Sequence, residues 1–361
     1  MKKNHDLCTT VITTRHMEPT IISAFFIGIS TAFFTIFAVH ILCYRKDRTH
    51  YQTVLGWVMA VWAVFSLKDL MLTFPQMYNT PILDKVMMVD GWSALTYTIL
   101  LFEIIMPRWT TWRRLLLLAI PFILFTTLYA LWTTKWVVYA YATFLWFYAW
   151  SIIFIGYIKA RRRIKYVREN FSNIDHIDVS WLRPVFCFMI VTQLLWLYTS
   201  LFPNEWTDIL YYSACLGAWL LVLHYSWNFQ PIEEISSTPA TDEDMQPDPS
   251  GKQYPFAERL EKLMLTQRLY LNKELTLDDL AMAVGTNRLY VSNYLNQTKR
   301  KTFYDYINQL RIEQVSLPLM KEHPELTLEH IAYESGFNSI STFRRAFVKL
   351  TGKTPSNFEK L

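Results

Sequence analysis

The sequence predicts an all-α protein in two parts: a bundle of seven transmembrane helices, then a soluble domain with a tandem helix-turn-helix. Two observations carry this prediction. Apolar runs of about 20 residues, long enough to cross a bilayer, recur before Gln230. From Tyr254 onward, apolar residues recur at helical spacing among polar ones, and one helical pattern occurs twice.

The composition locates most of the apolar residues in the first part. The chain has 361 residues, of which 52% are hydrophobic and 16% aromatic, which is too apolar for two ordinary soluble domains. The run from Thr20 to Tyr44 is longer than the core of a secretory signal, so we interpret it as a retained span. Four cysteines show no metal-ligand spacing and are expected to face lipid or the core: Cys8, Cys43, Cys187 and Cys215.

Seven segments have the length and composition of membrane-spanning helices. They cover residues 20–43, 54–74, 86–106, 115–132, 136–158, 182–202 and 206–227. Trp and Tyr lie near many of their ends, as in the aromatic belts of membrane proteins. A buried soluble core would explain one or two such segments but not seven in succession.

The loops between these segments alternate in charge. The second, fourth and sixth loops carry at most one Lys or Arg each, whereas the other three are basic. Because cytoplasmic loops retain Lys and Arg, we expect the N-terminus outside and everything after Trp227 in the cytoplasm. The basic loops contain Arg45, Lys46 and Arg48; Arg108, Arg113 and Arg114; and the run Lys159–Arg168. We interpret that run as a topology signal, with contact to anionic lipid as the alternative.

Charged side chains inside the spans are costly and are candidates for function. Lys68 and Asp90 lie at similar depth on neighbouring spans, so we expect them to pair, as a structural contact or as a sensing site. Asp69 points about 100° away from Lys68 on a helix and is not expected to face the same partner.

Residues 230–252 form a predicted linker. They are rich in proline and acidic residues and poor in large apolar ones, so they cannot bury a core and are expected to be disordered. A flexible coil of this length spans roughly 25 Å, which would hold residues 253–361 near the membrane without docking them on it.

The predicted soluble domain, residues 253–361, contains an internal repeat. After a first helix over residues 255–271, segments 275–281 (LTLDDLA) and 326–332 (LTLEHIA) share one pattern, and Gly285 and Gly336 follow at the same distance. In each copy a threonine caps a short helix with an acidic first turn, and the glycine permits a tight turn. A second amphipathic helix follows, over residues 287–296 and 339–350. Two such units make a tandem helix-turn-helix.

A longer helix, residues 303–322, is predicted between the two units, with Thr302 as its cap. At 1.5 Å per residue it spans about 30 Å, close to the roughly 34 Å between successive major-groove faces of DNA. One chain is therefore able to place both second helices on one side of a duplex. Pro318 lies inside this helix and should kink it, which leaves the angle between the units open.

These residues carry a family resemblance. The run Ile331-Ala332-x-x-x-Gly336-Phe337, with Phe343 and Phe347, and then Gly352-x-Thr354-Pro355-x-x-Phe358, resembles the DNA-binding domain of AraC/XylS-type regulators, as does Phe303-x-x-Tyr306-Ile307-x-x-x-Arg311. The resemblance covers about residues 254–361 and implies a bacterial transcription regulator. The chain departs from the family in its bundle, where a soluble module is usual, and in Glu359, where Arg is frequent.

Buried apolar side chains fix the face that each second helix, here called a recognition helix, presents to DNA. If Val291 and Leu295 are buried in the first unit, and Phe343 and Phe347 in the second, the polar side chains opposite them point toward DNA. The basic run ahead of the long helix suits phosphate contacts. The predicted DNA-binding residues are Arg288, Leu289, Ser292, Asn293, Asn296, Lys299, Arg300, Lys301, Ile340, Ser341, Arg344, Arg345 and Lys349.

Together these features predict a membrane-anchored, sequence-specific transcription regulator of the bacterial inner membrane, with the bundle as signal sensor or tether. We expect no catalytic residues, metal or cofactor, and hence no enzyme. The expected partners are double-stranded promoter DNA, membrane lipid and RNA polymerase; the signal ligand is unknown and a homodimer is left open. One alternative is a transporter or membrane enzyme with an appended regulatory domain, which paired broken helices would indicate. The other is a dormant factor released by proteolysis in the linker.

Overall fold

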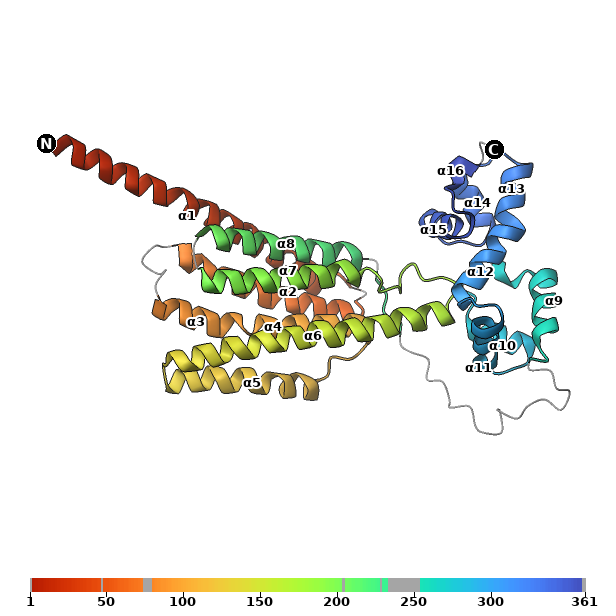
Figure 1. Ribbon diagram of the computed structural model, residues 1–361, viewed down its shortest axis with the longest axis horizontal. Coiled ribbons are helices and arrows are strands. Elements are labelled where there is room, and N and C mark those ends of the chain that lie inside the picture. The colour runs from red at the N-terminus through yellow and green to blue at the C-terminus, as the bar shows by residue number, and fades with distance from the viewer. Residues whose placement is uncertain are drawn as a thin grey trace. The chain divides into compact units, whose positions relative to one another are not determined.

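A computed structural model describes residues 2–46, 48–73, 80–202, 205–227, 229–232 and 254–358, excluding the side chains of residues 2–20, 72, 73, 80, 205 and 208. Within these ranges the chain is helical apart from turns and one isolated β-bridge, which confirms the all-α fold class. The chain divides into two compact units, Met1–Arg161 with Val179–Glu233, and Arg162–Asp178 with Glu234–Leu361 (Figure 1). Most of the predicted linker lies outside the described residues.

The first unit is a bundle of long helices. Its elements are α1 (Lys2–Val39), a π turn (His40–Tyr44), α2 (His50–Asp69), a 3-10 turn (Leu70–Thr73), α3 (Thr80–Asp90), α4 (Ser93–Ile105), α5 (Trp112–Leu131), α6 (Lys135–Asn170), α7 (Leu182–Leu201) and α8 (Glu205–Ser226). Helix α6 continues well past residue 158, where the predicted span ends, and its last residues belong to the second unit.

Six stretches among the described residues are long and apolar enough to cross a membrane. They are Ile21–Tyr44, Pro81–Ile105, Trp112–Leu131, Lys135–Asn170, Leu182–Leu201 and Ile209–Ser226, and they overlap six of the seven predicted spans. The remaining prediction, residues 54–74, falls on α2. That helix begins with polar His50–Thr53 and ends with Lys68 and Asp69, which shortens its apolar part. The count of seven spans therefore stays a prediction.

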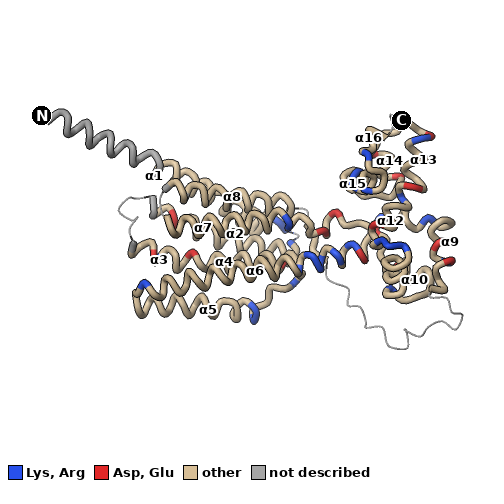
Figure 2. Tube along the Cα trace, in the orientation of Figure 1, with Lys and Arg blue, Asp and Glu red and all other residues tan. Residues whose placement is uncertain are grey.

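Two features of the bundle fit a lipid environment. Large apolar side chains are exposed along its helices, among them Trp57, Leu117, Trp136 and Phe154, whereas a protein in water rarely exposes large contiguous apolar patches. Most Lys and Arg residues of the described part of the bundle also lie toward one end of it, the end at which α6 terminates (Figure 2). The predicted third span is not one straight helix, because α3 and α4 are separated by a turn at Gly91–Trp92.

The second unit contains the two predicted helical hairpins. Its elements are α9 (Ala257–Gln267), a 3-10 turn (Leu269–Leu271), α10 (Leu277–Val284), α11 (Arg288–Asn293), a π turn (Tyr294–Thr298), α12 (Phe303–Arg311), a π turn (Ile312–Ser316), α13 (Leu317–Glu322), α14 (Leu328–Glu334), α15 (Ile340–Thr351) and α16 (Pro355–Phe358). Helices α10 and α11 form the first hairpin, and helices α14 and α15 form the second hairpin.

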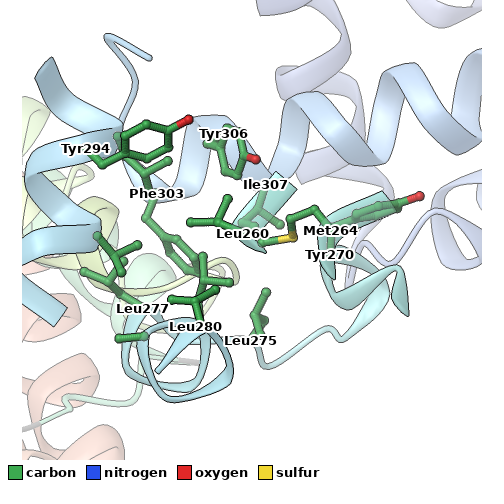
Figure 3. Packing of buried hydrophobic residues seen from close by; sticks show 14 of the residues in the cluster. Leu260, Met264, Tyr270, Leu275, Leu277, Leu280, Tyr294, Phe303, Tyr306 and Ile307 are labelled. Carbon is green, nitrogen blue, oxygen red and sulfur yellow. The ribbon is translucent and has the colours of Figure 1, made fainter. Parts of the chain in front are cut away.

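Each hairpin has its own apolar core. In the first, Leu260, Leu280, Leu295 and Ile307 are at most 1% exposed and pack together (Figure 3). The second core includes Ile312, Met320, Ile331, Ala332, Phe337, Phe343 and Phe347. The continuous helix α12 to α13 contributes to both cores, so it connects the two hairpins as the sequence predicted.

Two of the predicted helices are less regular than expected. The helix over residues 255–271 is interrupted at Arg268, whose φ of 49° is left-handed and ends α9. In the long helix, a π turn over Ile312–Ser316 precedes Pro318. A proline cannot donate a hydrogen bond to the preceding turn and its ring crowds that turn, so a locally widened turn is a physical way to accommodate it.

Candidate nucleic-acid interface

The first hairpin begins with the threonine cap, and turns at the glycine, that its sequence predicts. The hydroxyl of Thr276 accepts from the backbone N–H of Asp279 at 3.1 Å, and the Asp279 carboxylate accepts in return from the Thr276 N–H at 2.9 Å. Gly285 ends α10 in the left-handed conformation. Asn287 then caps α11 by accepting from the N–H of Leu289 at 2.8 Å. These bonds satisfy backbone groups at the helix ends and so fix the turn between the helices.

The first recognition helix consists of α11 and the π turn that follows it. Val291 and Leu295 are buried, as predicted, and Leu289 and Asn296 are exposed on its outer side. The Nδ2 of Asn296 donates to the Ser292 hydroxyl at 3.3 Å. Predicted base-contacting residues here include Arg288, Ser292 and Asn293, which are partly exposed, and Arg288 lies 3.5 Å from the carboxylate of Asp278.

The three basic residues before α12, Lys299, Arg300 and Lys301, differ in their side-chain contacts. Lys299 forms an ion pair with Glu261, and this hydrogen bond lowers the pKa of the Glu261 carboxyl and raises the pKa of Lys299. Lys301 contacts the side-chain oxygen of Gln309. Arg300 is exposed, and within the described residues its side chain makes no hydrogen bond or ion pair. Of the three, Arg300 is therefore the best placed for a phosphate contact.

The second hairpin repeats this construction. Thr327 caps α14 and Ser339 caps α15, each by accepting a backbone N–H at 3.2 Å. Gly336 lies in the turn between them with φ +86°, and a Cβ added there would lie 3.0 Å from the backbone of Leu271. Both the backbone conformation and the close approach therefore require glycine at this position.

The second recognition helix, α15, presents most of its predicted residues to solvent. Phe343 and Phe347 are fully buried, whereas Ser341, Arg344, Arg345 and Lys349 are exposed and Ile340 is half-buried. Lys349 pairs with Asp305 at 2.7 Å. Arg345 donates to the Thr342 hydroxyl at 2.9 Å and lies 3.6 Å from Asp175.

Arg311 was noted in the sequence only as part of a motif, and the structure shows what it contacts. Its guanidinium is 1% exposed and donates to the backbone carbonyls of Tyr270 at 2.7 Å and Asn272 at 2.9 Å. It also lies over the ring of Phe337 at 5.5 Å. Burial lowers the pKa of Arg311 to about 10, so the side chain remains charged at neutral pH. Arg311 thus ties the first hairpin to the second and does not face DNA.

The structure also brings the intramembrane residues Lys68 and Asp90 together, with the amine 2.7 Å from the carboxylate. Lys68 contacts Asp69 as well, a pair that was not predicted from the sequence. The long lysine side chain lets one ammonium group reach both carboxylates, which the angle between adjacent helical positions does not capture. The described residues contain no group of three or more His, Cys, Asp or Glu able to hold a metal ion.

Comparison with known proteins agrees with this geometry. A family model described as a helix-turn-helix domain matches residues 265–360. Residues of this chain are 29% identical over 103 residues to an uncharacterized HTH-type transcriptional regulator, YdeC, of Bacillus subtilis (strain 168), covering 28% of this chain and 35% of that protein. They are 31% identical over 98 residues to an uncharacterized HTH-type transcriptional regulator of Pseudoalteromonas carrageenovora, covering 27% of this chain and 56% of the relative.

A third relative, an HTH-type transcriptional regulator of Staphylococcus aureus (strain COL), is 29% identical over 90 residues, which cover 25% of this chain and 12% of the relative. The chain therefore spans between about an eighth and about half of the length of these relatives. No solved structure matches the chain at a significant level. The matched segment contains both hairpins and the helix that connects them. The C-terminal domain of this chain is therefore an AraC-type helix-turn-helix domain, and in the sequence it follows a bundle of apolar helices.

Proposed function

We propose that this chain is a membrane-anchored transcription regulator that binds promoter DNA through both recognition helices, with the bundle as sensor or tether. The observation that carries the proposal is that the described residues contain both six apolar stretches long enough to cross a membrane and a tandem helix-turn-helix. The recognition helices of this domain expose arginine, serine and asparagine side chains. Arginine and asparagine side chains are able to recognise guanine and adenine in the major groove.

The charge distribution supports the orientation of the proposed membrane domain. Loops rich in Lys and Arg alternate with loops that carry at most one, and this pattern supports a cytoplasmic location for residues after Trp227, where DNA is accessible. The proposed location is the bacterial inner membrane with the N-terminus outside. RNA polymerase and membrane lipid are proposed partners, and homodimerisation is left to measurement.

The first test examines DNA binding by the full chain in lipid nanodiscs. A pool of random duplexes is selected on the protein, and the enriched duplex is used for affinity measurements. We expect the double variant Arg300→Ala, Arg344→Ala to bind the enriched duplex much more weakly than the wild type does. The matched control is Lys321→Ala, Lys353→Ala, which removes the same charge from exposed positions outside the predicted interface. Equal binding by both double variants would contradict the proposed interface.

The second test locates the protein in cells. Full-length chain should remain in the membrane fraction after alkaline washing and should crosslink to defined promoters. Extraction by alkali would contradict membrane anchoring. A soluble fragment containing residues 254–361 would instead support release by proteolysis.

A further inference from the structure

The chain between α6 and α7 packs on the helix-turn-helix domain. Residues 171–178, here called the docking segment, belong to the same compact unit as the two hairpins. Ser172, Ile174 and Ile177 of this segment are buried. From the sequence, these residues are expected in a cytoplasmic loop, and no contact is predicted for them, so this packing is seen only in the structure.

Backbone bonds attach the docking segment to the start of the first hairpin. Phe171 and Thr276 form an antiparallel bridge, and the N–H of Ser172 donates to the carbonyl of Leu275 at 3.1 Å. Arg311 adds two longer bonds, to the Ser172 carbonyl and to its hydroxyl, each at 3.4 Å. The buried arginine that joins the two hairpins is therefore also bonded to this segment.

Side-chain bonds continue the contact toward the second hairpin. The carboxylate of Glu274 accepts from Asn173 of the docking segment at 3.1 Å. The same oxygen accepts from Asn338 at 2.8 Å, in the turn that precedes α15. Glu274 thus links the segment to the N-terminal end of the second recognition helix.

Asp175 contacts that recognition helix directly. Its carboxylate accepts a hydrogen bond from the hydroxyl of Thr342 and lies 3.6 Å from the guanidinium of Arg345. Arg345 is one of the predicted DNA-binding residues, and Thr342 lies one turn before it. The Asp175 side chain is 12% exposed and that of Arg345 63% exposed, so a largely buried carboxylate lies beside a guanidinium that remains accessible to solvent.

The Asp175 contact is incompletely satisfied. Its second carboxylate oxygen is buried, and among the described residues it has no hydrogen-bond partner. A buried carboxylate oxygen without a partner destabilises the contact that buries it. Such a contact is easier to displace than a fully bonded one, which suits a regulated surface better than a permanent structural one.

We propose that the docking segment is an intramolecular inhibitor of DNA binding, which holds the Asp175 carboxylate against the second recognition helix until a signal removes it. The inference rests on the proposed function, because it assumes that α15 binds DNA. A carboxylate at this place competes with DNA for Arg345 and repels the phosphate backbone. Because the segment follows α6 directly in the chain, a change in that apolar helix has a covalent route to the inhibitor.

The main test is Asp175→Asn in the full chain in nanodiscs, measured on the duplex selected as above. We expect Asp175→Asn to bind that duplex more tightly than the wild type does, by roughly 5- to 150-fold, the range of typical coupling between two sites. The matched control is Glu169→Gln, which removes the same charge from α6, where Glu169 pairs with Lys165 at 3.7 Å. This control should change the affinity far less than Asp175→Asn does.

A second test locks the segment in place. In the double variant Asp175→Cys, Thr342→Cys, oxidation should join the two positions that now share a hydrogen bond. We expect the oxidised protein to lose binding to the selected duplex and to recover it with reductant, whereas neither single variant should respond to reductant. Recovery on reduction separates locking from misfolding.

The outcomes separate this inference from the proposed function. If wild type binds the selected duplex and both Asp175→Asn and the oxidised double variant bind it equally well, the inhibitor is overturned and the proposed function stands. If no form enriches any duplex, including the locked, reduced and Asp175→Asn proteins, DNA binding itself is overturned and the inhibitor with it.

Discussion

Among the predicted DNA-binding side chains, the structure separates those that are already engaged from those that are not. Lys299, Lys349 and Arg345 each lie beside a carboxylate. Arg300 and Arg344 have no side-chain hydrogen bond or ion pair among the described residues. A side chain that must leave an ion pair to contact DNA loses the free energy of that pair, which offsets part of the binding free energy of the DNA contact. For exposed ion pairs this loss is small. Sequence reasoning identified the exposed face but had no means of seeing these internal partners.

The first prediction concerns base recognition by Arg345. We expect Arg345→Ala to weaken binding to the selected duplex by about 1–3 kcal/mol and to relax the preference at one base pair, because a bidentate contact to a base would be lost. The measurement compares affinities for the selected duplex and its single-base-pair variants. It is made in Asp175→Asn protein, so that losing the partner of Asp175 does not alter the result. Equal weakening on every duplex would argue against base recognition by Arg345.

The second prediction concerns phosphate contact by Arg300. We expect Arg300→Ala to weaken binding to all duplexes about equally and to reduce the salt dependence by roughly one ion, because a phosphate contact carries no base information. Affinity is measured on several duplexes over a series of salt concentrations. An unchanged salt dependence would show that Arg300 does not contact phosphate.

For single helices, the sequence was sufficient to predict the features that depend on residues close together in the chain. The threonine caps at positions 276, 302 and 327 are present, and the helix between the hairpins is continuous. The break at Arg268 and the π turn over Tyr294–Thr298 were not predicted, whereas the π turn over Ile312–Ser316 lies just before Pro318, where the sequence predicted a kink. The docking segment was missed for a stronger reason, since its contacts join residues far apart in the chain, such as Asp175 and Thr342.

The third prediction tests the turn of the second hairpin. We expect Gly336→Ala to destabilise the domain by more than about 1 kcal/mol, because it adds a clash with the Leu271 backbone to the strain of a left-handed conformation. Gly352→Ala is the matched control, since its φ is +73° and a Cβ there meets no atom within 4 Å. Hydrogen exchange of residues 254–358 in the full chain should therefore increase more for Gly336→Ala. Equal effects would mean that the approach of Leu271 does not matter.

The fourth prediction concerns the charged site between α2 and α3. Lys68 contacts both Asp69 and Asp90, so removing the lysine strands two carboxylates, whereas removing Asp90 leaves the lysine one partner. We expect Lys68→Ala to reduce the level of protein in the membrane more than Asp90→Ala does, and the double variant to be less harmful than the sum of the two. Strictly additive effects on protein level would indicate that the two side chains do not interact.

For the whole molecule, the open question is whether α2 crosses the membrane. The composition of α2 leaves it outside the six clear candidates, but its surface resembles theirs. Trp57, Val64 and Leu67 are exposed by 58% or more, while Val58 and Met59 are buried in the bundle. An exposed apolar face beside a buried one is what a helix between lipid and protein requires. The charges of the loops agree, since Arg45, Lys46 and Arg48 precede α2 and favour the cytoplasm.

The last prediction uses reporter fusions in these loops to decide whether the chain has six or seven membrane spans. If the C-terminal domain is cytoplasmic and α2 spans the membrane, a reporter fused after Arg48 lies in the cytoplasm; if α2 does not span, the same reporter lies outside. A fusion after Pro203 lies outside and one after Trp227 inside in both cases, so these two fusions serve as controls. We expect the Arg48 fusion to show cytoplasmic activity, because placing three basic residues outside opposes the usual retention of Lys and Arg. Outer-side activity of the Arg48 fusion would reduce the number of spans to six and place the N-terminus in the cytoplasm. Outer-side activity of the Trp227 fusion would contradict the proposed regulator itself, because its recognition helices would then lie on the side of the membrane without DNA.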